Sequence, residues 1–133
     1  MKGVILAGGL GSRLLPLTKV TNKHLLPVYH KPMIYYPIEA LVEAGVRDLM
    51  IVTGGNSSGD FLRLIGNGRQ FGLKHVSFAY QEGEGGIAYA LKLAHRFAAG
   101  ERVIVMLGDN IIGSSIRTSV QNFLKQKSGA RVI

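Results

Sequence analysis

The chain has 133 residues, of which 47% are hydrophobic, so it is long enough for one domain with a buried core and too short for two. No stretch approaches the roughly 18 consecutive apolar residues of a membrane-spanning helix. The amino terminus runs directly into Lys2–Ala7 without a signal-peptide pattern, so we expect a cytoplasmic protein with no membrane partner. There are no cysteines, which excludes disulfides and thiolate metal sites.

The formal net charge of +8 raises nucleic acid as a partner. However, the sequence lacks a recognised nucleic-acid reader motif, and its aromatic residues are not interleaved with basic ones, so we expect no nucleic acid. No acidic residue precedes Glu39, and a concentrated positive field of this kind suits a compact polyanion such as a triphosphate. The basic residues of this acid-free segment are Lys2, Arg13, Lys19, Lys23 and Lys31.

Short apolar runs alternate with longer amphipathic segments, which predicts an α/β domain with a mostly parallel sheet covered by helices. The expected strands are Val4–Ala7, Leu49–Thr53, Val76–Tyr80 and Val103–Leu107. The expected helices are Met33–Ala44, which Gly45 ends, Asp60–Ile65, Gly86–Phe97, and a segment marked by Ile116, Val120, Phe123 and Leu124. In the helix from Gly86, residues Ala88, Leu91 and His95 align on one side.

The last four residues, Ala130–Ile133, predict the beginning of a further strand. Such a strand would leave an unpaired edge, so pairing with a second copy in a homo-oligomer is a hypothesis for this end of the chain.

The first strand leads into a glycine-rich turn, Gly8-Gly9-Leu10-Gly11, followed by Arg13. Glycines permit positive φ and leave main-chain amides open to oxyanions, so the turn predicts a phosphate cradle. Arg13 places a permanent charge beside it. The turn is neither a P-loop nor a dinucleotide fingerprint, and a tight turn that needs glycine for geometry alone is the alternative. The candidate nucleotide-binding residues here are Leu6, Ala7, Gly8, Gly9 and Gly11.

Longer motifs extend this pattern over nearly the whole chain: Gly8–Leu14, Pro16–Thr18, Lys23–Val28, Lys31–Ile34 and Leu107–Asn110. Together they resemble the sugar-1-phosphate nucleotidylyltransferases, of the glucose-1-phosphate thymidylyltransferase type. The resemblance implies a Rossmann-like three-layer nucleotidyltransferase fold. It also implies that residues 1–133 are the nucleotide-binding part of that domain, truncated before the sugar-binding half is complete.

The reaction implied by the resemblance is attack of a sugar 1-phosphate on the α-phosphorus of a nucleoside triphosphate, which releases pyrophosphate. Such chemistry needs positioning and charge neutralisation more than a strong base. By resemblance, Arg13 activates the leaving pyrophosphate and Lys23 contacts phosphate near the reacting centre. Asp109, which follows the strand Val103–Leu107, is the expected Mg²⁺ ligand. The family's second metal carboxylate and its sugar-phosphate lysine are expected beyond Ile133.

Gln81 resembles the family's base-reading glutamine, and Gly86 a glycine that lets the base lie close. Thymine and uracil share the edge that an amide reads, so dTTP and UTP both stay open, with glucose 1-phosphate as the expected acceptor. His24 and His30 depart from the thymidylyltransferase pattern, and a lone histidine is more often structural than functional. The remaining alternatives are a nucleotide-binding but inactive fragment or regulatory module, and a molybdopterin or CDP-sugar variant of the same fold.

Overall fold

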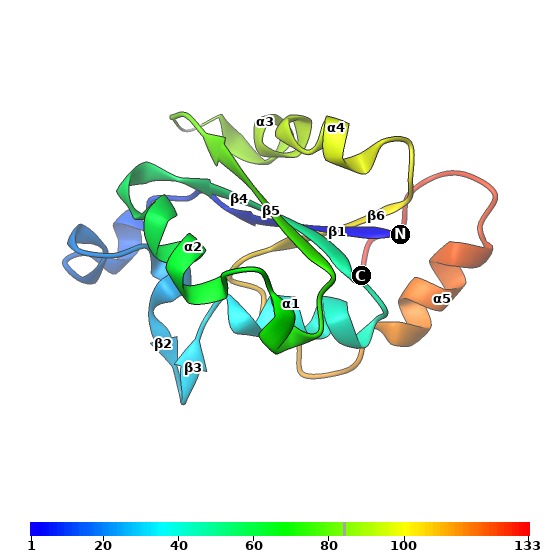
Figure 1. Cartoon of the computed structure of the whole chain (residues 1–133), viewed down its shortest axis with the longest axis horizontal. Coiled ribbons are helices and arrows are strands. Elements are labelled where there is room, and N and C mark those ends of the chain that lie inside the picture. The colour runs from blue at the N-terminus through cyan, green and yellow to red at the C-terminus, as the bar shows by residue number, and fades with distance from the viewer. Residues whose placement is uncertain (84) are drawn as a thin grey trace.

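The computed structural model describes residues 1–83 and 85–133. Its centre is a sheet of four parallel strands in the order β5-β4-β1-β6, so β1 lies inside the sheet, between β4 and β6 (Figure 1). The four expected strands are confirmed: β6 has the predicted bounds, β1 begins two residues earlier, and β4 and β5 are one residue longer at each end. The strands are β1 (Lys2–Ala7), β2 (Pro27–Val28), β3 (Lys31–Pro32), β4 (Asp48–Gly54), β5 (His75–Gln81) and β6 (Val103–Leu107).

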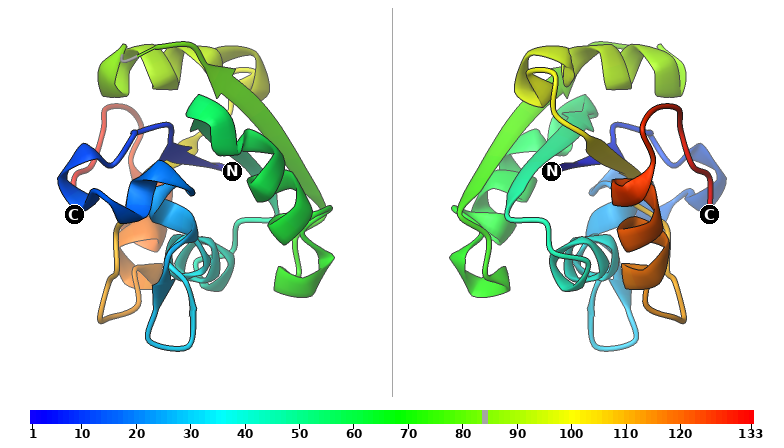
Figure 2. Two further views of the ribbon diagram at one scale, coloured as in Figure 1. Left: turned by 90° about the vertical axis from the view of Figure 1, so that its left-hand side faces the viewer. Right: turned by 90° about the vertical axis from the view of Figure 1, so that its right-hand side faces the viewer.

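Helices cover both faces of the sheet, as expected for a parallel sheet (Figures 1 and 2). Alternate side chains of β1 point to opposite faces. Ile5 and Ala7 join the larger hydrophobic core with α1, α2 and α5, whereas Val4 and Leu6 join a smaller core with α3. The helices are α1 (Tyr35–Glu43), α2 (Ser58–Ile65), α3 (Gly86–Leu93), α4 (His95–Ala98) and α5 (Arg117–Lys125). The fold is therefore the predicted three-layer α/β arrangement.

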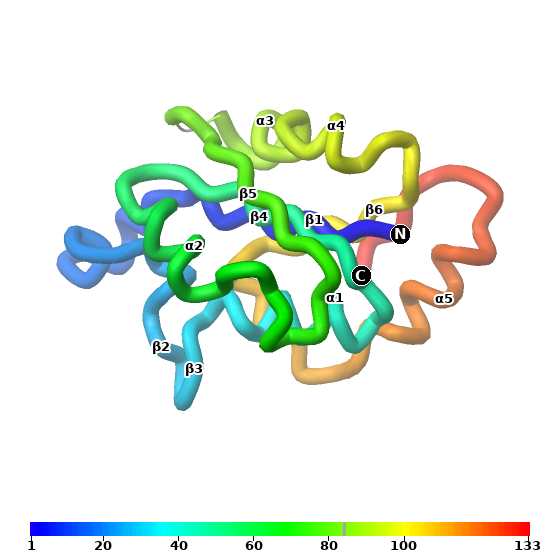
Figure 3. The backbone as a smooth tube through the Cα atoms, in the orientation of Figure 1, coloured from blue at the N-terminus to red at the C-terminus, as the bar shows by residue number. Residues whose placement is uncertain are grey.

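The long connection between β1 and α1 carries most of the basic segment. It leaves the sheet as a loop and returns through the antiparallel β2–β3 hairpin (Figure 3). Three short 3₁₀ helices lie on it: η1 (Ser12–Leu14), η2 (Leu17–Lys19) and η3 (Lys23–Leu25). Two more, η4 (Gly55–Ser57) and η5 (Arg69–Phe71), flank α2. The connection is thus held by short turns rather than by a long helix.

Helix α1 ends as the sequence predicted. Gly45 adopts φ +100, and its N–H donates to the carbonyl of Val42 at 3.0 Å. The N–H of Val46 donates to the carbonyl of Leu41, also at 3.0 Å, which completes a Schellman motif. Because Val46 and Leu41 are both fully buried, this end of the helix is fixed to the core.

The predicted helix Gly86–Phe97 is divided at Ala94 into α3 and α4. Ala90 and Ala94 pack on the sheet, whereas Ala88, Leu91 and His95 are exposed. Ala90 and Ala94 are four residues apart, so they lie on the same side of the helix. Because both side chains are small, the helix can approach the sheet closely. None of the helices in the described ranges is long and apolar enough to cross a membrane.

The predicted strand at Ala130–Ile133 was wrong. This segment has no regular structure, and Val132 and Ile133 are 95% and 67% exposed. A strand forms only where its backbone finds a ladder partner, and neither sheet of the described chain includes these residues. Pairing between copies at this end of the chain stays a hypothesis.

Candidate functional site

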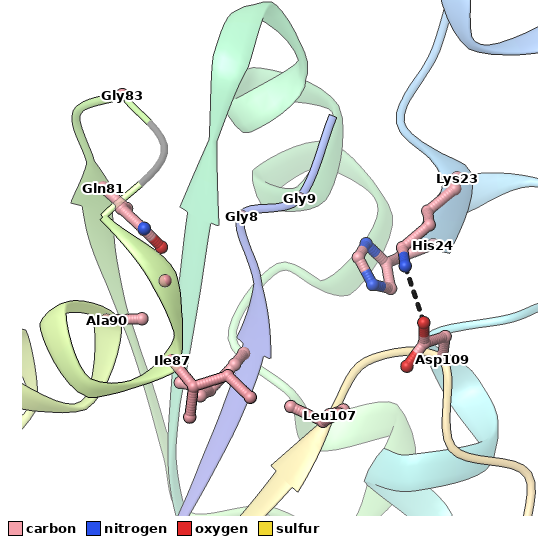
Figure 4. A pocket seen from close by; sticks show the side chains of 12 residues that line it. Gly8, Gly9, Lys23, His24, Gln81, Gly83, Ile87, Ala90, Leu107 and Asp109 are labelled. Carbon is pink, nitrogen blue, oxygen red and sulfur yellow. Dashed lines mark hydrogen bonds and ion pairs between the residues drawn. The ribbon is translucent and has the colours of Figure 1, made fainter. Parts of the chain in front are cut away.

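A cleft of about 310 Å³ opens at the carboxyl ends of β1, β5 and β6 (Figure 4). In parallel α/β sheets, ligands bind at this edge. Seven of the ten predicted site residues line it: Leu6, Gly8, Gly9, Lys23, Gln81, Gly86 and Asp109. The fold therefore brings together residues from the glycine-rich turn, the basic segment and the ends of two further strands.

The other three predicted residues do not line the cleft. Ala7 is fully buried in the larger hydrophobic core. Gly11 adopts φ +67, and its carbonyl accepts a hydrogen bond from the Thr18 hydroxyl at 2.9 Å, so it shapes the turn. Arg13 is exposed on η1, and its guanidinium makes no hydrogen bond or ion pair with the part of the chain that the structure describes.

The floor of the cleft is main chain, because glycines stand where side chains would collide. A Cβ at Gly8 would lie 2.7 Å from Oε1 of Gln81, and one at Gly108 would lie 2.7 Å from Cδ2 of His24. A Cβ at Gly54 would lie 2.9 Å from the carbonyl oxygen of Gly8 and 3.1 Å from that of Gln81. These glycines let neighbouring segments approach closely, and Gly8 and Gly9 line the cleft with main chain.

Lys23 and Asp109 form an ion pair at one end of the cleft, with 2.6 Å between Nζ and Oδ2. The hydrogen bond from Lys23 holds the pKa of the Asp109 carboxyl below its ordinary value, against the opposing effect of partial burial. The carboxylate is therefore charged at neutral pH. Both side chains remain partly exposed, so a ligand can reach them.

His24 lines the same end and is only 2% exposed. Burial, together with a smaller effect of the Lys23 charge and against the opposing Asp109 charge, lowers the pKa of its imidazole to about 4. The ring is therefore neutral at pH 7. Its Nδ1 lies 2.6 Å from Oδ1 of Asn22, a buried polar contact that the sequence analysis did not anticipate.

Gln81 stands at the other end of the cleft, at the end of β5, with the glycine-rich turn between it and Lys23 (Figure 4). It is 7% exposed, and the apolar side chains of α3 that line the cleft, Ile87 and Ala90, come from the helix that follows it in the chain. Besides His24, the lining residues that the sequence analysis missed are Gly83, Ile87, Ala90 and Leu107. Of these, Leu107 was detectable, because it ends a predicted strand two residues before Asp109.

The cleft thus has an apolar end with one buried amide and a polar end with a lysine, a carboxylate and open main chain. The apolar end fits a planar ring that carries polar edges, and the polar end fits an anionic group. Asp109 is the one carboxylate among the described lining residues, and no group of three or more His, Asp or Glu in that part of the chain could hold a metal alone.

The parallel sheet, with helices on both faces and a cleft at the carboxyl ends of its strands, defines an α/β domain that can bind a ligand at that edge. Residues 2–133 match the family described as "Nucleotidyl transferase", and the chain belongs to that family. It is 45% identical over 130 residues to the glucose-1-phosphate thymidylyltransferase of Actinoplanes sp., and 44% identical over 133 residues to that of Neisseria meningitidis. These matches cover 97% and 99% of this chain.

The solved structures agree with the sequence relatives. A Bacillus anthracis structure described as a glucose-1-phosphate thymidylyltransferase in complex with sucrose superposes with a TM-score of 0.94 at 49% identity, over 97% of this chain and 52% of that one. A UDP-glucose pyrophosphorylase complexed with UDP-glucose superposes with a TM-score of 0.69 at 26% identity, over 93% of this chain and 53% of that one.

The chain spans about half the length of these relatives: 43% of the Actinoplanes protein and 46% of the Neisseria protein.

Proposed function

We propose that the whole protein transfers a nucleotidyl group from dTTP or UTP to a sugar 1-phosphate, with glucose 1-phosphate as the acceptor, and releases pyrophosphate. In this proposal, residues 1–133 bind the nucleoside triphosphate. The observation that carries it is the order of groups along the cleft: Gln81 at one end, the main-chain floor at Gly8 and Gly9, and Lys23 at the other.

The order of groups assigns a role to each part. The buried Gln81 amide offers a donor and an acceptor to the edge of a pyrimidine, and Gly86 leaves room beside it. The amides at Gly8 and Gly9 and the Lys23 ammonium stabilise the phosphate chain. Thymine and uracil present the same edge to Gln81, so the proposal includes both nucleotides.

Arg13 remains a proposed leaving-group residue, although it lies outside the cleft lining. It sits on η1, four residues beyond Gly9, and its exposed side chain is held by no hydrogen bond or ion pair in the described chain. A long guanidinium side chain in this situation can reorient toward bound phosphates, where its charge would stabilise a departing pyrophosphate.

Mg²⁺ is the proposed metal ion. The donor set fits it in part: Asp109 supplies a hard, ionised oxygen at the phosphate end of the cleft, and the nucleotide phosphates would supply the rest. Bound there, the ion would neutralise phosphate charge. The role of this chain is to keep the carboxylate charged and in place, and the Lys23 hydrogen bond does so.

Calorimetric titration tests the binding part of the proposal. With Mg²⁺ present, we expect dTTP or UTP to bind and ATP or a DNA oligonucleotide to bind much more weakly. Gln81→Leu should reduce the preference for the pyrimidine nucleotides over ATP, because it removes the amide from the apolar end. Equal binding of all three nucleotides by the unsubstituted chain would contradict the assignment of Gln81.

A nucleotide-binding segment without turnover is the second candidate, favoured by the coverage of about half of each relative. Pyrophosphate release with glucose 1-phosphate as acceptor separates the two candidates. Turnover by residues 1–133 would exclude the inactive segment; binding without turnover would leave catalysis to the longer protein.

A further inference from the structure

A buried polar pair, Asn22 and His24, lies directly behind the polar end of the cleft. Both side chains are almost fully buried, at 6% and 2% exposed. Asn22 precedes η3, the 3₁₀ helix that begins at Lys23, and its Oδ1 accepts a hydrogen bond from the N–H of His24 at 3.0 Å. Asn22 is therefore the N-cap of the turn that carries Lys23.

The hydrogen bonds of Asn22 fix the orientation of its amide. Oδ1 faces a main-chain N–H, so it must be the oxygen, and Nδ2 faces the carbonyl oxygens of Ala7 and Gly9, each at 3.4 Å. Two separate sets of partners thus give the same assignment. One amide joins the glycine-rich turn to the segment that carries Lys23.

The amide orientation in turn fixes the protonation of His24. Nδ1 lies 2.6 Å from the same Oδ1, which only accepts, so Nδ1 must carry the proton. Since the pKa of the ring is lowered to about 4, the imidazole is neutral at pH 7 and Nε2 has a free lone pair. The ring packs against Gly108, the residue before Asp109, where a Cβ would lie 3.1 Å from Nε2.

We propose that Asn22 and His24 are positioning residues of the nucleotide site: they hold the glycine-rich turn, Lys23 and the Gly108–Asp109 segment at fixed separations, with the imidazole as the neutral tautomer protonated on Nδ1. This inference rests on the proposed function for the identity of the ligand and on the described contacts for the rest. Neither residue needs to touch the nucleotide. Each acts through the groups that do, as supporting hydrogen bonds do at other preorganised sites.

The tautomer is tested without any ligand. ¹⁵N NMR of the histidine side chains in the unsubstituted chain should show His24 protonated on Nδ1 and unprotonated on Nε2. In Asn22→Ala the ring loses the acceptor that holds its proton, and we expect Nε2–H to become populated, while the exposed His95 is unchanged. A His24 ring that is protonated on Nε2 in the unsubstituted chain, or that is unaffected by Asn22→Ala, would overturn the proposal.

Amide hydrogen exchange tests the positioning role, again without ligand. Asn22→Ala and His24→Ala should speed exchange at Leu25, Leu26 and Gly108, whose N–H groups donate to the carbonyls of Asn22, Lys23 and Leu6. His24→Gln should restore part of the protection because its amide can still donate to Asn22. Val120→Ala, a core substitution in α5, controls for general loss of stability. If it speeds exchange at the same amides as strongly, the pair is only structural and the proposal fails.

Nucleotide affinity gives the functional readout, measured below the unfolding temperature of each variant. We expect Asn22→Ala and His24→Ala to weaken binding of dTTP or UTP at least roughly tenfold, and Val120→Ala to leave it unchanged. Full affinity in both alanine variants would overturn the positioning role. If the unsubstituted chain binds neither nucleotide, the proposed function fails, and the NMR and exchange results still decide the role of the pair.

Discussion

Lys23 and Asp109 are 86 residues apart in the sequence, and their Nζ and Oδ2 atoms lie 2.6 Å apart in the fold. The contact joins η3 to the loop after β6, so one ion pair connects two sides of the cleft. If a metal ion also binds the Asp109 carboxylate, the neighbouring Lys23 ammonium is well placed to contact an anionic ligand. The first two predictions follow from this pair.

Lys23→Met should weaken dTTP or UTP binding about ten- to hundredfold in the presence of Mg²⁺. The substitution keeps the apolar stem and removes the charge, and a hydrogen bond to a charged group contributes about 1.5–3 kcal/mol. Calorimetry measures the change. Lys31→Met is the matched control, because Lys31 pairs with Glu39 away from the cleft; an equal loss there would mean that net charge, not position, is responsible.

Asp109→Asn should abolish the gain in nucleotide affinity that Mg²⁺ provides. The amide has nearly the shape of the carboxylate but offers the ion no charge, so affinities with Mg²⁺ and with a chelator should converge. Glu39→Gln removes a different lysine-paired carboxylate and should keep the full Mg²⁺ effect. A Mg²⁺ effect of normal size in Asp109→Asn would remove Asp109 from the metal site.

Stability should fall as the pH is lowered from 6.5 to 4 because of His24. The folded-state pKa of its imidazole is about 4 against an ordinary 6.5, so the unfolded chain binds a proton in this window that the folded chain does not. The free energy of unfolding should therefore drop by on the order of 3 kcal/mol. The Asp109 carboxyl, with its lowered pKa, contributes a further loss only below its ordinary value of 3.8.

Urea denaturation at several pH values measures this dependence. His24→Gln cannot titrate, so its stability should be nearly flat between pH 6.5 and pH 4 apart from changes that all variants share. His95→Gln, at an exposed position, should retain the slope of the unsubstituted chain. Equal slopes in His24→Gln and the unsubstituted chain would contradict the assignment of the buried ring.

Gly54→Ala should destabilise the fold by about 1–3 kcal/mol, because the added Cβ meets backbone atoms of Gly8 and Gln81 that cannot move independently. Gly59→Ala is the matched control: it lies in α2, and a Cβ there has no neighbour within 4 Å. That substitution should stabilise the chain by roughly 0.4–1 kcal/mol. Urea midpoints of the two variants should therefore move in opposite directions.

Much of the fold was predictable because each strand is a short apolar run bounded by turn residues. Val103–Leu107 matched to the residue, and Gly45 ended its helix as expected. The errors arose where packing decides. Ala130–Ile133 forms no strand because no partner strand of the described chain adjoins it, and the sequence did not indicate that Ala90 and Ala94 would be the buried residues of the helix from Gly86.

Most residues of the site were predictable from the sequence, but the contacts between them were not. The motifs identified Lys23, Gln81 and Asp109 as site residues, and the cleft contains all three. The role of Asn22 was not accessible, because it depends on the carbonyls of Ala7 and Gly9 lying beside it in space. The burial of the His24 ring was not predictable either, because the adjacent sequence does not indicate that this side chain is buried.

The glycines at positions 8, 54 and 108 also bear on how this cleft could change during evolution. Peptide groups have the same chemistry whatever residues carry them. A substitution changes such a surface mainly by adding a side chain that fills the cleft. New ligand preferences would therefore arise more readily at side chains that line the same cleft, such as Ile87 and Leu107, than at its glycines.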